Sequence, residues 1–154
     1  MRINLEKVEY RPARYTDAAD LFEIKNDPDV RRFSIVTKDR ILWENHINWI
    51  TKKLKDENVQ IYCIVYKGFV LGDVRLDLGK EEIEVSIRLL PQARGQGVGS
   101  KSVRRATEYA VKIAKGRRIT AKILANNIPS MRTFKRVGFV VDRFDREINY
   151  MRYV

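Results

Sequence analysis

The sequence predicts a single domain of the α/β (α+β) class over residues 1–154, with a mixed central sheet of about seven strands and about four flanking helices. Three observations support this fold class. The length of 154 residues is that of one ordinary domain. Apolar residues make up 44% and charged residues 33% of the chain, which suits a soluble globular core. Segments with the two-residue period of strands alternate with segments that have the period of helices.

The first part of the chain predicts one strand and two helices ahead of a run of strands. Residues 8–11 predict a strand that Pro12 ends. Thr16 is the expected N-cap of a short helix that ends near Asn26-Asp27-Pro28. A longer helix is expected from about Leu42 to Asp56, because apolar side chains recur there at steps of three and four residues. These side chains are Trp43, His46, Ile47, Ile50 and Leu54.

Three strands with short turns follow, and helices and strands then alternate. The three strands are expected at residues 60–66, 70–78 and 83–90. In the third of them, Glu84, Ser86 and Arg88 share the polar face. The remaining elements are a helix from Ser100 to Lys115, a strand at 119–125, a helix from Pro129 to Val137 and two strands between Phe139 and Val154. The expected element order is therefore βααβββαβαββ.

Charge is distributed unevenly along the chain and favours an anionic partner. Residues 1–93 hold 16 basic and 16 acidic side chains, whereas residues 94–154 hold 15 basic and 4 acidic ones, so the whole net charge of +11 lies in the second segment. The candidate partners are nucleic acid, an acidic membrane surface or a phosphate-bearing small molecule. A solvated basic surface is the alternative that needs no partner.

Other composition data narrow the function classes. One cysteine, Cys63, and one histidine, His46, exclude a disulfide within the chain and metal sites built from several Cys or His ligands. No apolar run approaches the roughly 20 residues that span a bilayer. The N-terminal residues lack the apolar core of a secretory signal. We therefore expect a cytoplasmic protein with no membrane partner.

The strongest local motif is a glycine-rich loop between a strand and a helix, Arg94-Gly95-Gln96-Gly97-Val98-Gly99-Ser100. Glycines allow the backbone to approach a ligand closely. The first N–H groups of the helix are unpaired and carry a partial positive charge. Together these features indicate a phosphate-binding site, although an ordinary glycine-rich turn has the same composition. The spacing matches neither a Walker A loop nor a dinucleotide-binding fingerprint.

A second motif strengthens the interpretation of the first. Asn127, Ser130, Phe134 and Gly138-Phe139 follow the pattern N-x-x-S-x-x-x-[YF]-x-x-x-G-F. Together with the R-x-x-G-x-G spacing of the loop and the element order, this pattern resembles the GNAT N-acetyltransferase superfamily over essentially the whole chain. The first half is similar to a subgroup that acts on nucleotide-linked amino sugars. This similarity is carried by Arg11-Pro12-Ala13 and by residues 26–32 and 43–50. N-terminal acetyltransferases of ribosomal proteins carry related strings.

The resemblance implies acetyl-CoA as cosubstrate and no metal. By the family pattern, backbone N–H groups from Arg94 to Ser100 would bind the pyrophosphate. Main-chain groups of Leu89 and Leu90 would hold the pantetheine arm and the thioester carbonyl, and Asn127 would hydrogen-bond the pantetheine region. The same motif implies cofactor contacts for Ser130 and Phe134. Lys135 and Arg136 are the candidates for the 3′-phosphate, and solvated surface charges are the alternative for both.

The implied reaction is direct attack of a primary amine on the thioester carbonyl, with a backbone N–H near Leu89 stabilising the oxyanion. The amine must first lose a proton, and Glu84 is the candidate base because related enzymes place one on this strand. A salt-bridged strand glutamate is the alternative. His46 is the second candidate, as a base or a substrate-binding residue, and a packed core histidine fits its position equally. Many family members have a tyrosine acid where this chain has Phe134, so the general acid stays unassigned.

The acceptor is expected to be a small molecule such as a nucleotide-linked amino sugar, bound around residues 26–49, with a protein N-terminus as the alternative. Two further classes stay open. One is a catalytically silent fold that senses coenzyme A, and the other is a nucleic-acid-binding module. The second would use the basic helix that carries Lys101, Arg104, Arg105, Lys112 and Lys115. A homodimer is compatible with the sequence.

Overall fold

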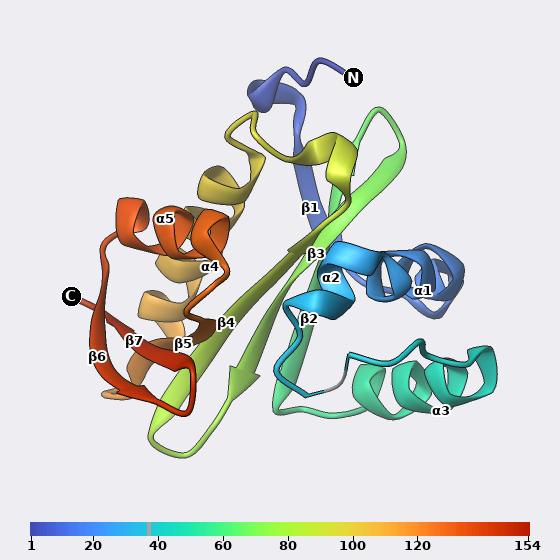
Figure 1. Cartoon of the computed structure of the whole chain (residues 1–154). Helices are drawn as coiled ribbons and strands as arrows, with labels where there is room; N and C mark the ends of the chain where they lie inside the picture. The colour runs from blue at the N-terminus through green and yellow to red at the C-terminus, as the bar shows by residue number, and fades with distance from the viewer. Residues whose placement is uncertain (37) are drawn as a thin grey trace.

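The computed structural model describes residues 1–36 and 38–154 and is built around one mixed β-sheet of seven strands (Figure 1). The strand order is β1-β2-β3-β4-β5-β7-β6, and only β4 and β5 pair in parallel within the described residues. The strands are β1 (Glu9–Pro12), β2 (Val59–Tyr66), β3 (Phe69–Leu78), β4 (Glu82–Leu89), β5 (Arg118–Leu124), β6 (Phe139–Asp145) and β7 (Ile148–Tyr153). This confirms the predicted fold class.

The helices agree with the prediction except near the N-terminus. They are α1 (Ala18–Asn26), α2 (Pro28–Arg32), α3 (Trp43–Leu54), α4 (Val98–Ile113) and α5 (Ile128–Val137), so the described residues form five helices and not four. The additional helix is α2, which begins at the proline that we expected only to end a helix. Thr16 is not the N-cap of α1, because it lies in the 3₁₀ turn Tyr15–Asp17 and α1 begins at Ala18.

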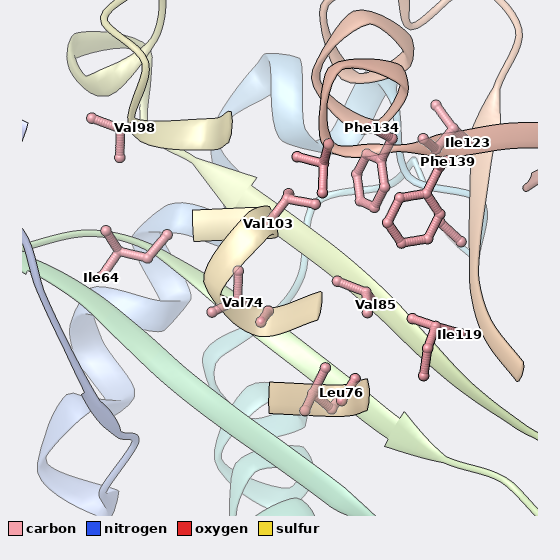
Figure 2. Close-up of a cluster of buried hydrophobic side chains, with 14 of the residues drawn as sticks. Ile64, Val74, Leu76, Val85, Val98, Val103, Ile119, Ile123, Phe134 and Phe139 are labelled. Atoms are coloured by element: carbon pink, nitrogen blue, oxygen red, sulfur yellow. The ribbon is translucent and has the colours of Figure 1, made fainter. Parts of the chain in front are cut away.

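Helices cover both faces of the sheet. On one face, α4 and α5 bury the larger core, in which Val103, Val85 and Phe134 meet (Figure 2). On the other face, α1 and α3 lie over β2 and bury a smaller core around Leu21 and Ile50. None of the described helices is both long and apolar enough to cross a membrane.

The parallel pair β4 and β5 opens at one end. Pairing joins residues 82–84 of β4 to residues 118–120 of β5, whereas β4 continues to Leu89 and β5 to Leu124. Beyond the paired residues, the facing backbone groups of the two strands lack the strand partner that they would have in a continuous sheet. Only Leu90 and the 3₁₀ turn Pro91–Ala93 separate the end of β4 from the glycine-rich loop. The opening and the loop therefore lie next to each other.

Candidate active site

At the end of β4, the main-chain N–H groups of Leu89 and Leu90 are directed to opposite edges of the strand. The Leu90 N–H donates to the Leu71 carbonyl of β3 at 2.9 Å, and the Leu90 carbonyl accepts from the Ala93 N–H at 3.0 Å. The Leu90 N–H is therefore occupied and its carbonyl accepts one hydrogen bond, so the contact of Leu90 with the pantetheine arm stays a prediction. Successive residues of a strand point their N–H groups to opposite edges. The N–H of Leu89 is therefore directed to the β5 side, where the sheet is open.

The loop between Pro91 and α4 has the geometry of an anion site. Gly95 and Gly97 adopt φ values of 73° and 86°, which favour glycine. Gly97 is the N-cap of α4, and the first N–H inside the helix to find a partner is that of Lys101, which donates to the Gly97 carbonyl at 3.1 Å. The preceding N–H groups, of residues 98–100, are the unpaired donors of the helix start. They carry the positive end of the helix dipole.

The side chain of Gln96 is directed away from this cradle and ties the loop to the N-terminal segment. Its Oε1 accepts from the Ile3 N–H at 2.8 Å, and its Nε2 donates to the Met1 carbonyl at 2.8 Å and the Gln92 carbonyl at 3.1 Å. A methyl group built on Gly97 would lie 3.1 Å from Leu5 Cδ1. The N-terminal segment therefore packs against the outside of the loop.

The last turn of α5 lies beside the first turn of α4. Arg136 Nη1 donates to Ser100 Oγ at 3.3 Å, which places a guanidinium at the first turn of α4. Asn127 is the N-cap of α5, and its Oδ1 accepts from the Ser130 N–H at 3.3 Å. Among the described residues the Asn127 Nδ2 group has no partner, so its two donors are available. Lys135 is exposed on the last turn of α5.

Phe134 lies in the core beneath α5. Its side chain is only 2% exposed and packs edge-on against Phe139, with ring centroids 5.0 Å apart (Figure 2). The structure therefore gives Phe134 a packing role, and its contact with the cofactor stays a prediction.

Glu84 lies at the last residue pair of β4 and β5 before the opening. Its Oε1 is 3.1 Å from Lys122 Nζ, and this contact raises the pKa of the Lys122 ammonium. The Glu84 side chain is 26% exposed, so solvent reaches the carboxylate. The predicted base is thus an ion-paired carboxylate on the face shared with Ser86 and Arg88.

His46 is a core residue. Its side chain is fully buried, and Nε2 donates to the Ala18 carbonyl at 2.7 Å. Burial lowers the pKa of the imidazole, so the neutral form is favoured. The ring packs among Phe22, Trp43 and Trp49. These contacts leave the imidazole without exposed surface, which favours the alternative interpretation of His46 as a packed core histidine. Within the expected acceptor region, 26–49, residue 37 lies outside the described residues.

The structure shows a buried lysine that we did not predict. Lys25, in the last turn of α1, is 8% exposed, and its amine lies over the ring of Trp49. Burial and the nearby Arg88 lower the pKa of Lys25 to about 6, although Asp73 acts in the opposite direction. The sequence does carry a signal, because residues 18, 21, 22 and 25 lie on one helical stripe.

Comparison with known proteins agrees with this geometry. Residues 7–140 match the family model described as the acetyltransferase (GNAT) domain. A domain from Methanocaldococcus jannaschii DSM 2661 has a TM-score of 0.81 and 23% identity, with 95% of this chain and 96% of that chain covered.

Two similar structures contain coenzyme A. Spermidine N-acetyltransferase from Vibrio cholerae, in complex with CoA and spermine, has a TM-score of 0.80 and 16% identity, with 96% of this chain and 94% of that chain covered. AAC(6')-Ib, in complex with ribostamycin and coenzyme A, has a TM-score of 0.83 and 17% identity, with coverages of 96% and 93%. These likenesses establish a shared fold.

Proposed function

Because the chain belongs to the GNAT acetyltransferase family, we propose that it transfers the acetyl group of acetyl-CoA to a primary amine by direct attack. The observation that supports this function best is the opening between β4 and β5 beside the cradle at the start of α4. In this proposal the thioester lies in the opening against the N–H of Leu89, and the diphosphate lies against the N–H groups of residues 98–100.

The cofactor would be held by main-chain groups and by a few side chains. Backbone N–H groups from Gly95 to Ser100 are the proposed donors to the pyrophosphate, whereas the Arg94 N–H already donates to the Pro91 carbonyl at 3.1 Å. The free Nδ2 donors of Asn127 are available to the carbonyl groups of the pantetheine arm. Arg136, fixed beside Ser100, is the proposed partner of the 3′-phosphate. The net charge of +11 favours capture of such an anion.

The chemistry needs one proton removed and one negative charge stabilised. We assign the oxyanion donor to the Leu89 N–H, which acts at the open edge of β4. Glu84 is the proposed base, with a water molecule carrying the proton where the amine does not reach the carboxylate. Phe134 has no ionisable proton and therefore cannot act as the general acid. Departure of coenzyme A as a thiolate is accessible without one, because a thiol of pKa about 8.5 costs only about 2 kcal/mol to ionise at pH 7.

The proposed acceptor carries a negative group beside its amine. The similar structures bind spermine and ribostamycin, which are polycations. The excess positive charge of this chain lies in residues 94–154, which are assigned to the cofactor, whereas the acceptor region, residues 26–49, holds four basic and four acidic side chains. A nucleotide-linked amino sugar, which combines a free amine with phosphate charge, is the candidate that the similarity of residues 11–13, 26–32 and 43–50 favours. A protein N-terminus is the second candidate acceptor.

Isothermal titration with acetyl-CoA tests the cofactor assignment. We expect micromolar-range binding by the wild type and loss of binding by Gly97→Trp. Gly116→Trp is the matched control, because Gly116 has nearly the same φ of 87° but lies beyond the other end of α4. Its binding should equal that of the wild type. Absence of binding by the wild type would refute the proposal.

An acceptor screen that follows thiol release tests the second half of the function. It compares amino-sugar nucleotides, N-terminal peptides and polyamines at one acetyl-CoA concentration. We expect turnover with the amino-sugar nucleotides. Faster turnover with polyamines would contradict the proposed acceptor class, and no turnover with any amine in a protein that binds acetyl-CoA would favour a coenzyme A sensor.

A further inference from the structure

The side chain of Arg94 does not face the cradle at the start of α4. Its Nε and Nη2 donate to the Leu89 carbonyl at 3.1 and 2.7 Å. Its Nη1 donates to Asp29 Oδ2 at 2.9 Å, and Nη2 also donates to Asp27 Oδ2 at 3.1 Å. One guanidinium therefore joins the end of β4, the cofactor loop and helix α2, which are far apart in the sequence.

The Asp27 carboxylate has two tasks. Its Oδ2 also accepts from the N–H groups of Asp29 and Val30, both at 3.1 Å, and so caps the start of α2. The Asp27 side chain is 12% exposed, whereas that of Asp29 is 44% exposed. Because one oxygen serves both the helix and the arginine, α2 cannot shift relative to Arg94 without loss of hydrogen bonds. Partial burial makes that loss costly for Asp27.

The contact between the Arg94 guanidinium and the Leu89 carbonyl affects the positions of two proposed subsites, those for the thioester and for the diphosphate. Leu89 contributes the N–H that we assign to the oxyanion, and its carbonyl belongs to the following peptide unit. Its side chain approaches the start of α4, since a methyl group on Gly99 would lie 3.5 Å from Leu89 Cδ1. A shift at Arg94 therefore changes the positions of both the thioester and the diphosphate sites.

We propose that Asp27 and Asp29 are positioning residues for acetyl transfer, which act through Arg94 to fix the cofactor loop and the end of β4 against the acceptor-side helix α2. This inference rests on the proposed function, because the loop is assigned to acetyl-CoA there. The two carboxylates touch neither the cofactor site nor the reacting atoms. Their effect passes through the guanidinium and the Leu89 carbonyl.

Positioning and simple electrostatics predict opposite results for the same variant. Asp27→Asn with Asp29→Asn removes two negative charges near a site for a diphosphate. If charge alone mattered, acetyl-CoA would bind more tightly. If positioning matters, binding weakens because Arg94 loses its charged partners. Asparagine caps helices as well as aspartate does, so α2 keeps its N-cap.

The matched control is Asp142→Asn with Asp145→Asn on the edge strand β6. Both residues are exposed and ion-paired with arginines, Asp142 with Arg152 at 3.3 Å and Asp145 with Arg143 at 3.4 Å. Asp142 also lies 3.9 Å from Arg118. The control therefore makes the same change in net charge and breaks three arginine contacts. Titration with acetyl-CoA should show at least about tenfold weaker binding for the α2 variant and no weakening for the control. Equal or tighter binding by the α2 variant would overturn the proposal.

Arg94→Lys supplies a second test, because lysine keeps the charge but cannot reach three acceptors with a planar fork. It should weaken binding as much as the α2 variant does. Adding both aspartate changes to Arg94→Lys should cause little further loss, because the residues act as one unit. Additive losses would show that the carboxylates act independently of Arg94.

Amide hydrogen exchange in the free protein separates this inference from the proposed function. Exchange of the hydrogen-bonded amides of Leu90, Arg94 and Lys101, which lie before, in and after the loop, should be faster in the α2 variant than in the β6 control, whether or not acetyl-CoA is the ligand. If the wild type does not bind acetyl-CoA, the proposed function fails, and the exchange rates still decide the positioning role. Identical exchange in both variants would refute that role.

Discussion

Lys25 should make the stability of the protein depend on pH over a wide interval. Burial and, second, Arg88 lower the pKa of Lys25 to about 6 in the folded protein. In the unfolded chain the amine has its ordinary pKa of about 10.4. Between these two values the unfolded chain binds one more proton than the folded protein. The free energy of unfolding therefore rises as the pH rises through this interval.

The magnitude follows from one proton. The slope is at most about 1.4 kcal/mol per pH unit. From about pH 7 to 8.5, the amine is mostly neutral in the folded protein and almost fully protonated in the unfolded chain, so Lys25 contributes about 2 kcal/mol to the pH dependence. The charged groups that face it are Arg88, Asp73, Arg75 and Lys53, and all four stay in place when Lys25 is substituted.

The substitution Lys25→Met keeps an unbranched side chain against Trp49 and removes the titrating amine. Urea unfolding of both proteins at several pH values from about 7 to 8.5 gives the difference in unfolding free energy. The contribution of Cys63 cancels in this difference because both proteins contain it. Besides burial, the Lys25 charge also lowers the pKa of His46, so the measurement starts at about pH 7, above the ordinary pKa of histidine, where the imidazole is mostly neutral in both proteins. We expect the wild type to gain about 2 kcal/mol on the variant across the interval. A difference that stays constant with pH would refute the reasoning.

Three further predictions concern the proposed site and the small core. In calorimetric titrations, Arg136→Ala should bind CoA about tenfold more weakly than the wild type does, because the charge-assisted contact with the 3′-phosphate is lost. Its binding of 3′-dephospho-CoA, which lacks that phosphate, should be unchanged, and Arg132→Ala is the control. Glu84→Gln should lower kcat by about 10²–10⁴ without raising the KM for acetyl-CoA in steady-state kinetics. The Arg11 hydrogen bonds lower the pKa of the Asp17 carboxyl, so this pair stabilises the fold above the ordinary aspartate pKa and loses that effect as the pH falls. Acid unfolding of Arg11→Met should therefore be less steep.

Most of the fold was predictable because period and turn chemistry agree along the chain. The strand expected at 70–78 is Phe69–Leu78, since apolar and polar residues alternate there between two turns. Helix α2 was not predictable from periodicity, because five residues are too few to show a helical period. A proline at position 28 is compatible with the end of one helix or with the first residue of another. In the structure the Asp27 side chain caps the helix that begins at Pro28, so the second interpretation is correct.

The candidate site was predictable where local conformation depends on residue type. Gly95 and Gly97 occupy left-handed backbone conformations, as a glycine-rich loop indicates. The partners of Arg94 were not predictable, because Asp27 and Asp29 lie 67 and 65 residues away and no local pattern reports such contacts. The occupied groups of Leu90 depend on strand register, which the sequence does not specify at that point.

The segment between Asn26 and Ile41, which forms most of the proposed acceptor region, is closed by hydrogen bonds at its two ends. It is therefore suited to replacement by a segment from another protein. The Asn26 side chain makes hydrogen bonds with both backbone groups of Ile41: its Nδ2 donates to the carbonyl at 2.9 Å, and its Oδ1 accepts from the N–H at 2.7 Å. The two ends of the intervening segment are therefore pinned together, and doubling its length would cost only about 0.6 kcal/mol in closure entropy. Segments taken from other amine-modifying enzymes are expected to graft between Asn26 and Ile41 without unfolding the host, provided that the pair of aspartates travels with them.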